Sequence, residues 1–270
     1  MFYGLMKRSS STLDRWLISK KKGDQATDGS PLESVPKGNE SDEVTEQSMV
    51  EALGRLDGRD IRWQQKEASN LSLSYTMLLR KREADFVFAS LENSIQYYSG
   101  ELAQIMVHGK WCPIPRKQVA YGDPGLSYHF SGIAIPAKPW TPLLKGLCDA
   151  VSCIASTKFN FVLINRYKDG SDRVGEHKDD EIDLDPAAPI ASVSLGQPRD
   201  FVFRHQDARG RHKAGSSLHE PVTLMLEHGS LLLMNPPTNL FWYHSLPPRK
   251  RAVQPRINLT FRKLVTKPSQ

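Results

Sequence analysis

The chain has 270 residues, enough for one sizeable domain or two small ones. Its 36 Lys and Arg residues exceed its 30 Asp and Glu residues, and the net charge of +6 favours a polyanionic partner without identifying one. The three cysteines are few and scattered, which disfavours a disulfide framework or a zinc finger and predicts a reducing compartment. No apolar run reaches the roughly 18 residues of a membrane span, and the N-terminus has no secretory core.

Residues 1–58 are predicted to form a disordered tail, followed by one folded domain at 59–265. Ser, Gly, Pro and charged residues dominate from Lys20 to Glu46 without a sustained period. Within the tail, the segment Arg15–Ile18 places an aromatic and two aliphatic residues ahead of three lysines, as in a short docking peptide. The alternative is a chance apolar cluster beside a basic run of the nuclear-import type.

Two helices are predicted in the first half of the domain. From Lys81 to Tyr98, apolar residues recur at steps of three and four, and Gly100 indicates the end of that helix. A second helix is predicted over Thr141–Ala155, with Pro142 tolerated in its first turn. Both helices are expected to pack outside a sheet.

After the second helix the pattern changes to short strands with turn-rich connections. The predicted strands are Phe159–Asn165, Ile190–Leu195, Asp200–Arg204, Val222–Glu227, Ser230–Met234 and Arg256–Arg262. This succession predicts a mainly β fold with flanking helices and a double-stranded β-helix (jelly roll) core. The polar segment Asp207–Glu220 is expected to be a long loop, and its histidines His205, His212 and His219, in or near it, are expected to be exposed.

One stretch carries a candidate metal site. His177 and Asp179 are two residues apart, so on an extended backbone they point to the same side and can reach one ion together. A third ligand must come from far along the chain, and His244 is the candidate. Two histidines and one carboxylate form the facial triad of non-haem Fe(II) oxygenases, which leaves positions open for substrates.

The last predicted strand has one apolar and one polar face. With period two, the polar face is made of Arg256, Asn258, Thr260 and Arg262. This face is either a solvent-facing edge or the inside of a barrel that binds a small dicarboxylate, because guanidinium groups bind carboxylates in a bidentate manner. Asn165 and Tyr167 repeat the polar pattern on another predicted strand.

Taken together, the order Asn-x-Tyr, His-x-Asp, a distant His and Arg-x5-Arg resembles the AlkB family of Fe(II)/2-oxoglutarate dioxygenases, and most of all its nuclear DNA-dealkylating members. The resemblance covers about residues 60–265 and includes Phe161–Gly170, Pro115–Gln118 and Phe201–His205. It implies three ligands to Fe(II): His177, Asp179 and His244. It also implies these residues around 2-oxoglutarate: Asn165, Tyr167, His244, Arg256, Thr260 and Arg262. Oxygen is the co-substrate, and ascorbate is an expected aid.

The resemblance further implies that the enzyme removes the methyl group of 1-methyladenine and 3-methylcytosine, and attacks etheno adducts, in double-stranded DNA. Succinate, carbon dioxide and formaldehyde are released, and the damaged base must be flipped out of the duplex. The residues expected to enclose or read the base are Tyr128, His129, Phe130, His177, Asp180 and Glu181. The residues expected to contact phosphates, unless they belong to solvated loops, are Arg116, Arg249, Lys250 and Arg251.

The loop His108-Gly109-Lys110 corresponds to a finger that enters the duplex in these relatives. Its tip is usually phenylalanine in the family, so His108 departs from the pattern, although imidazole can also stack on bases. A similar motif in the tail of family members binds the replication sliding clamp. We also expect the protein to be a monomer located in the nucleus, with alkylated DNA and the clamp as its partners.

Two other functions compete with this interpretation. One is an Fe(II)/2-oxoglutarate oxygenase that acts on RNA or protein, and the other is a non-catalytic adaptor that binds DNA or the clamp. The complete triad and both arginines disfavour the adaptor.

Overall fold

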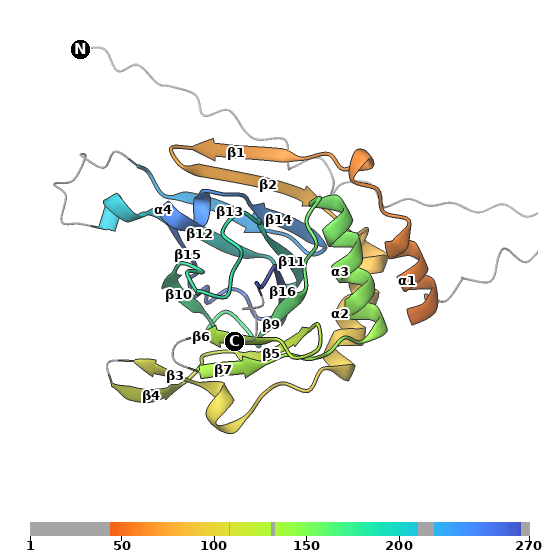
Figure 1. Ribbon diagram of the computed structural model, residues 1–270, viewed down its shortest axis with the longest axis horizontal. Coiled ribbons are helices and arrows are strands. Elements are labelled where there is room, and N and C mark those ends of the chain that lie inside the picture. The colour runs from red at the N-terminus through yellow and green to blue at the C-terminus, as the bar shows by residue number, and fades with distance from the viewer. Residues whose placement is uncertain (1–43, 108, 131–132, 210–218, 266–270) are drawn as a thin grey trace, which may run out of the picture. The chain divides into compact units, whose positions relative to one another are not determined.

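The computed structural model describes residues 44–107, 109–130, 133–209 and 219–265 (Figure 1). Among the residues singled out in the sequence, Arg15–Ile18, His108 and His212 lie outside these ranges. None of the described helices is long and apolar enough to cross a membrane.

The core consists of two sheets. The strands of the larger sheet are β1 (Gln64–Ala68), β2 (Leu71–Met77), β5 (Lys117–Gly122), β8 (Lys138–Pro139), β9 (Phe161–Tyr167), β11 (Ile190–Gly196), β14 (Ser230–Met234) and β16 (Arg256–Arg262). Their order is β1-β2-β14-β11-β16-β9-β5-β8, and every pair is antiparallel except β5 with β8. The strands of the smaller sheet are β10 (Val174–His177), β12 (Arg199–His205), β13 (Val222–Leu226) and β15 (Trp242–Leu246), in the order β10-β15-β12-β13. The predicted jelly-roll core is confirmed.

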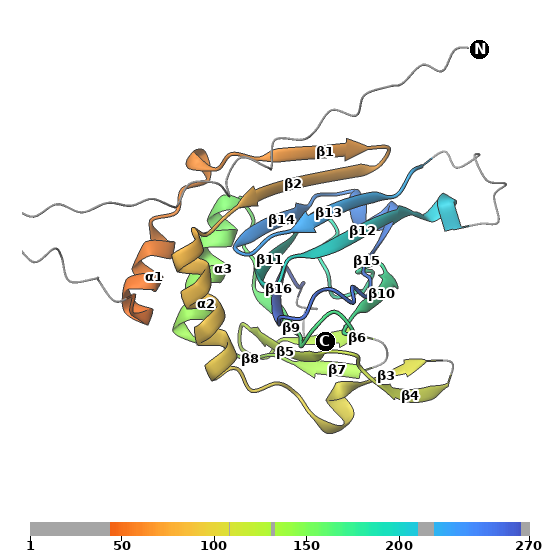
Figure 2. The same cartoon turned by 180° about the vertical axis from the view of Figure 1, so that it is seen from behind.

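Two hairpins stand beside these sheets. They are formed by β3 (Gln104–Val107) with β4 (Lys110–Pro113) and by β6 (Ser127–Phe130) with β7 (Ile133–Pro136). Figure 2 shows the β3–β4 hairpin projecting at one end of the molecule, away from the helices.

The helices are α1 (Glu46–Gly54), α2 (Lys81–Ser94), α3 (Pro142–Ile154) and α4 (Thr238–Phe241), with short 3-10 helices η1 (Gly58–Asp60), η2 (Gly100–Ala103) and η3 (Gln206–Arg209). Helices α1, α2 and α3 gather beside the larger sheet, opposite the smaller one (Figures 1 and 2). Their apolar residues share one buried cluster with β5, β9, β11, β14 and β16. Both predicted helices therefore pack outside the sheet, as expected.

Strand β16 lies in the middle of the larger sheet, between β11 and β9. Ile257, Leu259 and Phe261 join the cluster under the helices, while the alternate residues face the other sheet. All seven residues are buried, so the solvent-facing edge is excluded for this strand. The same alternation on β9 directs Asn165 and Tyr167 to the inner side.

One predicted boundary is wrong. The first helix ends at Ser94 rather than near Tyr98, because the backbone becomes extended at Ile95 and the Tyr98 N–H donates to Gln118 on β5. Helix α1 lies within residues 1–58, which were predicted to be a disordered tail, although its side chains belong to the buried core. This helix was not predicted.

Helix α1 is held by its two buried side chains, Met49 and Leu53, which belong to the cluster shared with α3. Its start is fixed by a capping box in which Thr45 and Ser48 satisfy each other's backbone N–H groups. The hairpin β1–β2 was also missed, although Leu71 and Leu73 alternate with polar residues as in a half-buried strand.

Candidate active site

The three predicted metal ligands converge between the two sheets. His177 ends β10 and pairs in register with His244 on β15, so the two imidazoles are cross-strand neighbours. The Nε2 atoms of His177 and His244 lie 3.6 and 3.9 Å from Oδ1 of Asp179. One donor atom from each of the three residues lies within 4.8 Å of the other two. A single ion can therefore contact all three.

The protonation states of these residues match the needs of a metal. Burial, together with His177, lowers the pKa of His244 to about 3, so this imidazole is neutral. Burial alone would raise the pKa of Asp179, but Arg262 and the two imidazoles offset it and lower the pKa to about 2. Nδ1 of His177 donates to the Gly175 carbonyl at 2.9 Å, which directs the Nε2 lone pair toward Asp179.

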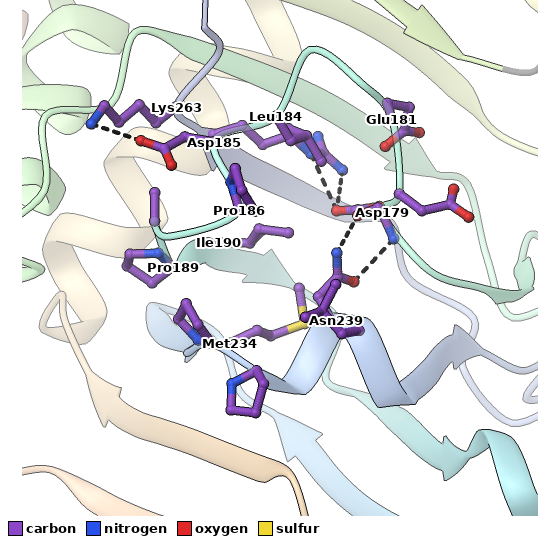
Figure 3. Close-up of a pocket in the computed structure, with 16 residues that line it drawn as sticks. Asp179, Glu181, Leu184, Asp185, Pro186, Pro189, Ile190, Met234, Asn239 and Lys263 are labelled. Atoms are coloured by element: carbon purple, nitrogen blue, oxygen red, sulfur yellow. Dashed lines mark hydrogen bonds and ion pairs between the residues drawn. The ribbon is translucent and has the colours of Figure 1, made fainter.

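Two further residues hold Asp179 in place. Arg262 donates to Oδ2 through Nη2 at 2.7 Å and Nε at 3.2 Å, which leaves Oδ1 for the imidazole side. Asn239 accepts the Asp179 N–H at 3.0 Å and donates to its carbonyl, so it holds both backbone polar groups of one ligand (Figure 3). Sequence reasoning did not find Asn239, because an amide in the short helix α4 carries no metal signature.

The residues predicted to bind a dicarboxylate line one cavity with the triad. They are Asn165, Tyr167, Arg256, Thr260 and Arg262. The Nε atom of Arg256 and the Nη1 atom of Arg262 are buried with no hydrogen-bond partner among the described residues. Burial lowers the pKa of Arg256 to about 10, which still leaves it charged at neutral pH. Two buried cations with unused N–H donors indicate an anionic ligand in this cavity.

Arg116 lines the same cavity, contrary to its predicted role at phosphates. Its Nε donates to Oδ1 of Asn165 at 2.6 Å, so the guanidinium points inward beside the predicted dicarboxylate site. Arg249 is also engaged, since its Nη1 lies 3.1 Å from Oδ2 of Asp200. Lys250 and Arg251 are exposed, as a phosphate contact requires.

The residues that were predicted to contact the damaged base differ in how deeply their side chains are buried. Tyr128 is fully buried, and its ring lies 5.0 Å from the guanidinium carbon of Arg262. Glu181 lies half-buried, and burial together with Asp179 raises its pKa to about 7. Glu181 and the exposed Asp180 line a second cavity of ≈ 180 Å³ on the other side of Asp179, whose wall includes Leu184, Pro186 and Met234 (Figure 3).

The remaining residues that were predicted to contact DNA are His129, Phe130, Gly109 and Lys110. The exposed His129 pairs with Asp183, with Nδ1 2.6 Å from Oδ2. The side chain of Phe130 lies outside the described part of the structure. Gly109 and Lys110 are exposed at the end of the β3–β4 hairpin, where Gly109 has a φ of +77° that favours glycine.

The expected exposure of His205 is wrong. It is 3% exposed, and it packs against Trp242 with ring centroids 5.2 Å apart. The signal was present in the sequence, because His205 follows Phe201 and Phe203 at steps of two and shares their side of β12. His219 is half-buried, and His212 lies outside the described residues.

Comparison with known proteins identifies the family. Residues 75–262 match the model of the 2OG-Fe(II) oxygenase superfamily. The chain is 54% identical over 214 residues to the mouse DNA oxidative demethylase ALKBH2, covering 79% of this chain and 88% of the relative. It is 55% identical over 203 residues to the human protein of that name, covering 75% and 77%.

More distant relatives match as well. The mouse alpha-ketoglutarate-dependent dioxygenase alkB homolog 3 is 36% identical over 157 residues, covering 58% of this chain and 54% of the relative. A solved structure titled "The structure of OsALKBH1" aligns with a TM-score of 0.48 at 15% identity, covering 74% of this chain and 100% of that one.

The donor set around Asp179 fits Fe(II), and the unpaired guanidinium N–H groups fit the dianion 2-oxoglutarate. With the match over residues 75–262, this chain belongs to the 2OG-Fe(II) oxygenase superfamily and is an Fe(II)- and 2-oxoglutarate-dependent dioxygenase.

Proposed function

We propose that this dioxygenase is a DNA repair enzyme that oxidatively demethylates 1-methyladenine and 3-methylcytosine, acts also on etheno adducts, and prefers double-stranded DNA. One observation carries the proposal: the His177–Asp179–His244 cluster opens onto a cavity with two buried, partly unpaired arginines. The similarity to curated DNA oxidative demethylases, over three quarters of this chain or more, supports DNA as the substrate class.

Each part of the cavity has a task in this reaction. His177, Asp179 and His244 would hold Fe(II), and Arg256 and Arg262 would hold the carboxylates of 2-oxoglutarate. Three more polar residues complete the co-substrate wall: Asn165, Tyr167 and Thr260. Bound iron, 2-oxoglutarate and oxygen supply the oxidation of the methyl group.

The oxidation consumes one molecule of O2 and one of 2-oxoglutarate, and it forms succinate, CO2, formaldehyde and the unmodified base. One atom of O2 enters 2-oxoglutarate as it loses CO2 and becomes succinate, and the other enters a C–H bond of the N-methyl group. The resulting N-hydroxymethyl group releases its hydroxyl proton to solvent and leaves as formaldehyde when its C–N bond breaks. The electron pair of that bond stays on the ring nitrogen, and the base is restored.

Substrate charge explains the acidic residues beside the metal ligands. 1-Methyladenine and 3-methylcytosine are cationic, so a nearby carboxylate favours them over neutral bases. Glu181 has a pKa of about 7 because it is buried near Asp179, and a bound cation would favour its ionised form. Asp180 is exposed and would meet the base at the mouth of the site.

The projecting β3–β4 hairpin supports contact with a duplex (Figure 1). Met106 and Trp111 face each other across its strands, and both are exposed. Lys110, near the tip, is exposed and could contact a phosphate, as could Lys250 and Arg251. Apolar side chains on a projecting hairpin suit insertion between bases.

The decisive assay measures formaldehyde release from a duplex oligonucleotide that contains 1-methyladenine. We expect release only when Fe(II) and 2-oxoglutarate are both present, and we expect Asp179→Ala to abolish it, because one of the three ligands is lost. Asp149→Ala, which changes a side chain on α3 that is 62% exposed, serves as a carboxylate control and should retain most activity. Release from methylated RNA or peptide but not from DNA would instead favour the competing oxygenase.

We infer a monomer that works in the nucleus and contacts the replication sliding clamp through Arg15–Ile18, on the basis of the basic and aromatic pattern of that segment. Trp16→Ala should weaken capture of the clamp on beads while formaldehyde release from a short oligonucleotide stays unchanged. Equal clamp capture by both proteins would remove this part of the proposal.

A further inference from the structure

A second cluster of metal-ligating side chains lies outside the active site. His205 ends β12, Asp207 lies in η3, and His219 precedes β13. One donor atom from each of these residues lies within 4.8 Å of the other two, as in the catalytic cluster. Strands β12 and β13 are hydrogen-bonded neighbours (Figure 1), so the cluster joins the two ends of the connection between them.

The spacing of the cluster suits a single ion. Nδ1 of His205 lies 3.5 Å from Oδ2 of Asp207, close to the 3.6 and 3.9 Å between the catalytic imidazoles and Asp179. Two ligands that each lie about 2.0–2.2 Å from a tetrahedral Zn²⁺ are separated by roughly 3.4 Å. The rings of His205 and His219 lie 3.9 Å apart between centroids, so little movement is needed to bring the third donor in.

The buried member of the cluster, His205, has ring nitrogens that are poorly satisfied by hydrogen bonds. His205 is 3% exposed, and its Nε2 has no hydrogen-bond partner among the described residues. Its Nδ1, the ring atom that lies 3.5 Å from Oδ2 of Asp207, accepts the Asp207 N–H at 3.3 Å, which is long for a hydrogen bond. A cation bound at Nδ1 would replace this weak contact with a coordination bond.

We propose that His205, Asp207 and His219 form a second metal site, for a divalent transition cation of the Zn²⁺ type. Two imidazoles and one carboxylate select such an ion over Mg²⁺ or Ca²⁺, which prefer oxygen ligands, and water would take the fourth position. The site fixes both ends of the β12–β13 connection and differs from the iron centre in all three ligands.

The site also has a physical link to the iron centre. Lys178, between His177 and Asp179, donates to Oε1 of Gln206 at 2.9 Å. Gln206 lies between His205 and Asp207, so an ion bound there would restrain the partner of Lys178.

Metal content of the full-length chain tests the proposal without relying on turnover. The metal-free protein is dialysed against Zn²⁺ and the bound metal is measured by atomic emission. We expect two equivalents per chain, because Zn²⁺ also occupies the catalytic ligands, and one equivalent in Asp179→Ala. His219→Ala should also keep one, and the double variant should keep none.

Two further variants separate ligand loss from misfolding. Asp207→Ala changes a side chain that is 68% exposed, so it should lose one equivalent with an unchanged circular dichroism spectrum. His129→Ala removes an exposed histidine elsewhere and should keep both equivalents. A wild-type chain that binds one equivalent, lost in Asp179→Ala, would overturn the proposal. So would full retention of metal in both His219→Ala and Asp207→Ala.

Discussion

At the residue scale, Asn239 tests how the iron ligand Asp179 is positioned. Its amide holds the N–H and the carbonyl of Asp179 at the same time, whereas Arg262 holds only the carboxylate. Asn239→Ala should raise the Fe(II) concentration needed for half-maximal activity by ~10–100-fold, the usual effect of removing an outer partner of a metal ligand. An Fe(II) titration of formaldehyde release measures it.

The adjacent Leu240 provides the matched control. Its side chain is 61% exposed, so Leu240→Ala should leave the Fe(II) requirement close to wild type. Excess Fe(II) should restore Asn239→Ala toward the wild-type rate, because the amide positions a ligand and does not touch the substrate. A variant that loses maximal rate with an unchanged Fe(II) requirement would contradict this role.

At the element scale, the turn after β9 is held against the turn that follows β15. Gly170 exchanges backbone hydrogen bonds with Arg249 and Ala252, and a Cβ at residue 170 would lie 1.7 Å from the Arg249 carbonyl oxygen. Gly170→Ala should therefore destabilise the fold by about 1–3 kcal/mol or more, since backbone must shift. Thermal unfolding should show a lower Tm than wild type.

Gly54 is the control for this substitution. It ends α1, and a Cβ there would meet no atom within 4 Å, so Gly54→Ala should leave the Tm close to wild type. If both variants unfold at the wild-type temperature, the close contact at Gly170 does not contribute to stability.

The strand β16 illustrates which features of the fold can be predicted from the sequence and which cannot. The alternation in Arg256–Arg262 predicted which residues share a face, because a period of two is a local property. It could not decide between an edge and a central strand, since β9 and β11 come from distant parts of the chain. The misplacement of Arg116 has a related cause: a basic residue after a proline looks like a surface loop until its partner Asn165 is known.

At the scale of the whole molecule, truncation tests where the folded domain starts. Deleting residues 1–42 should leave the Tm unchanged, whereas deleting residues 1–58 removes α1 and uncovers the α3 surface. Loss of Met49 and Leu53 from the core should cost several kcal/mol, given ~2–5 kcal/mol for truncating one such side chain. Calorimetry of both truncated chains distinguishes the two boundaries, and equal Tm values would restore the predicted one.

The two arginines of the inner cavity have a consequence for the chain without its ligands. Arg262 is paired with Asp179, but Arg256 is buried with an unused donor and no carboxylate partner among the described residues, so an anionic ligand would neutralise it. Part of the free energy of 2-oxoglutarate binding would then offset the desolvation of a guanidinium group that the fold keeps buried. Folding and co-substrate binding are therefore linked equilibria, and 2-oxoglutarate well above its Kd should raise the Tm of the protein.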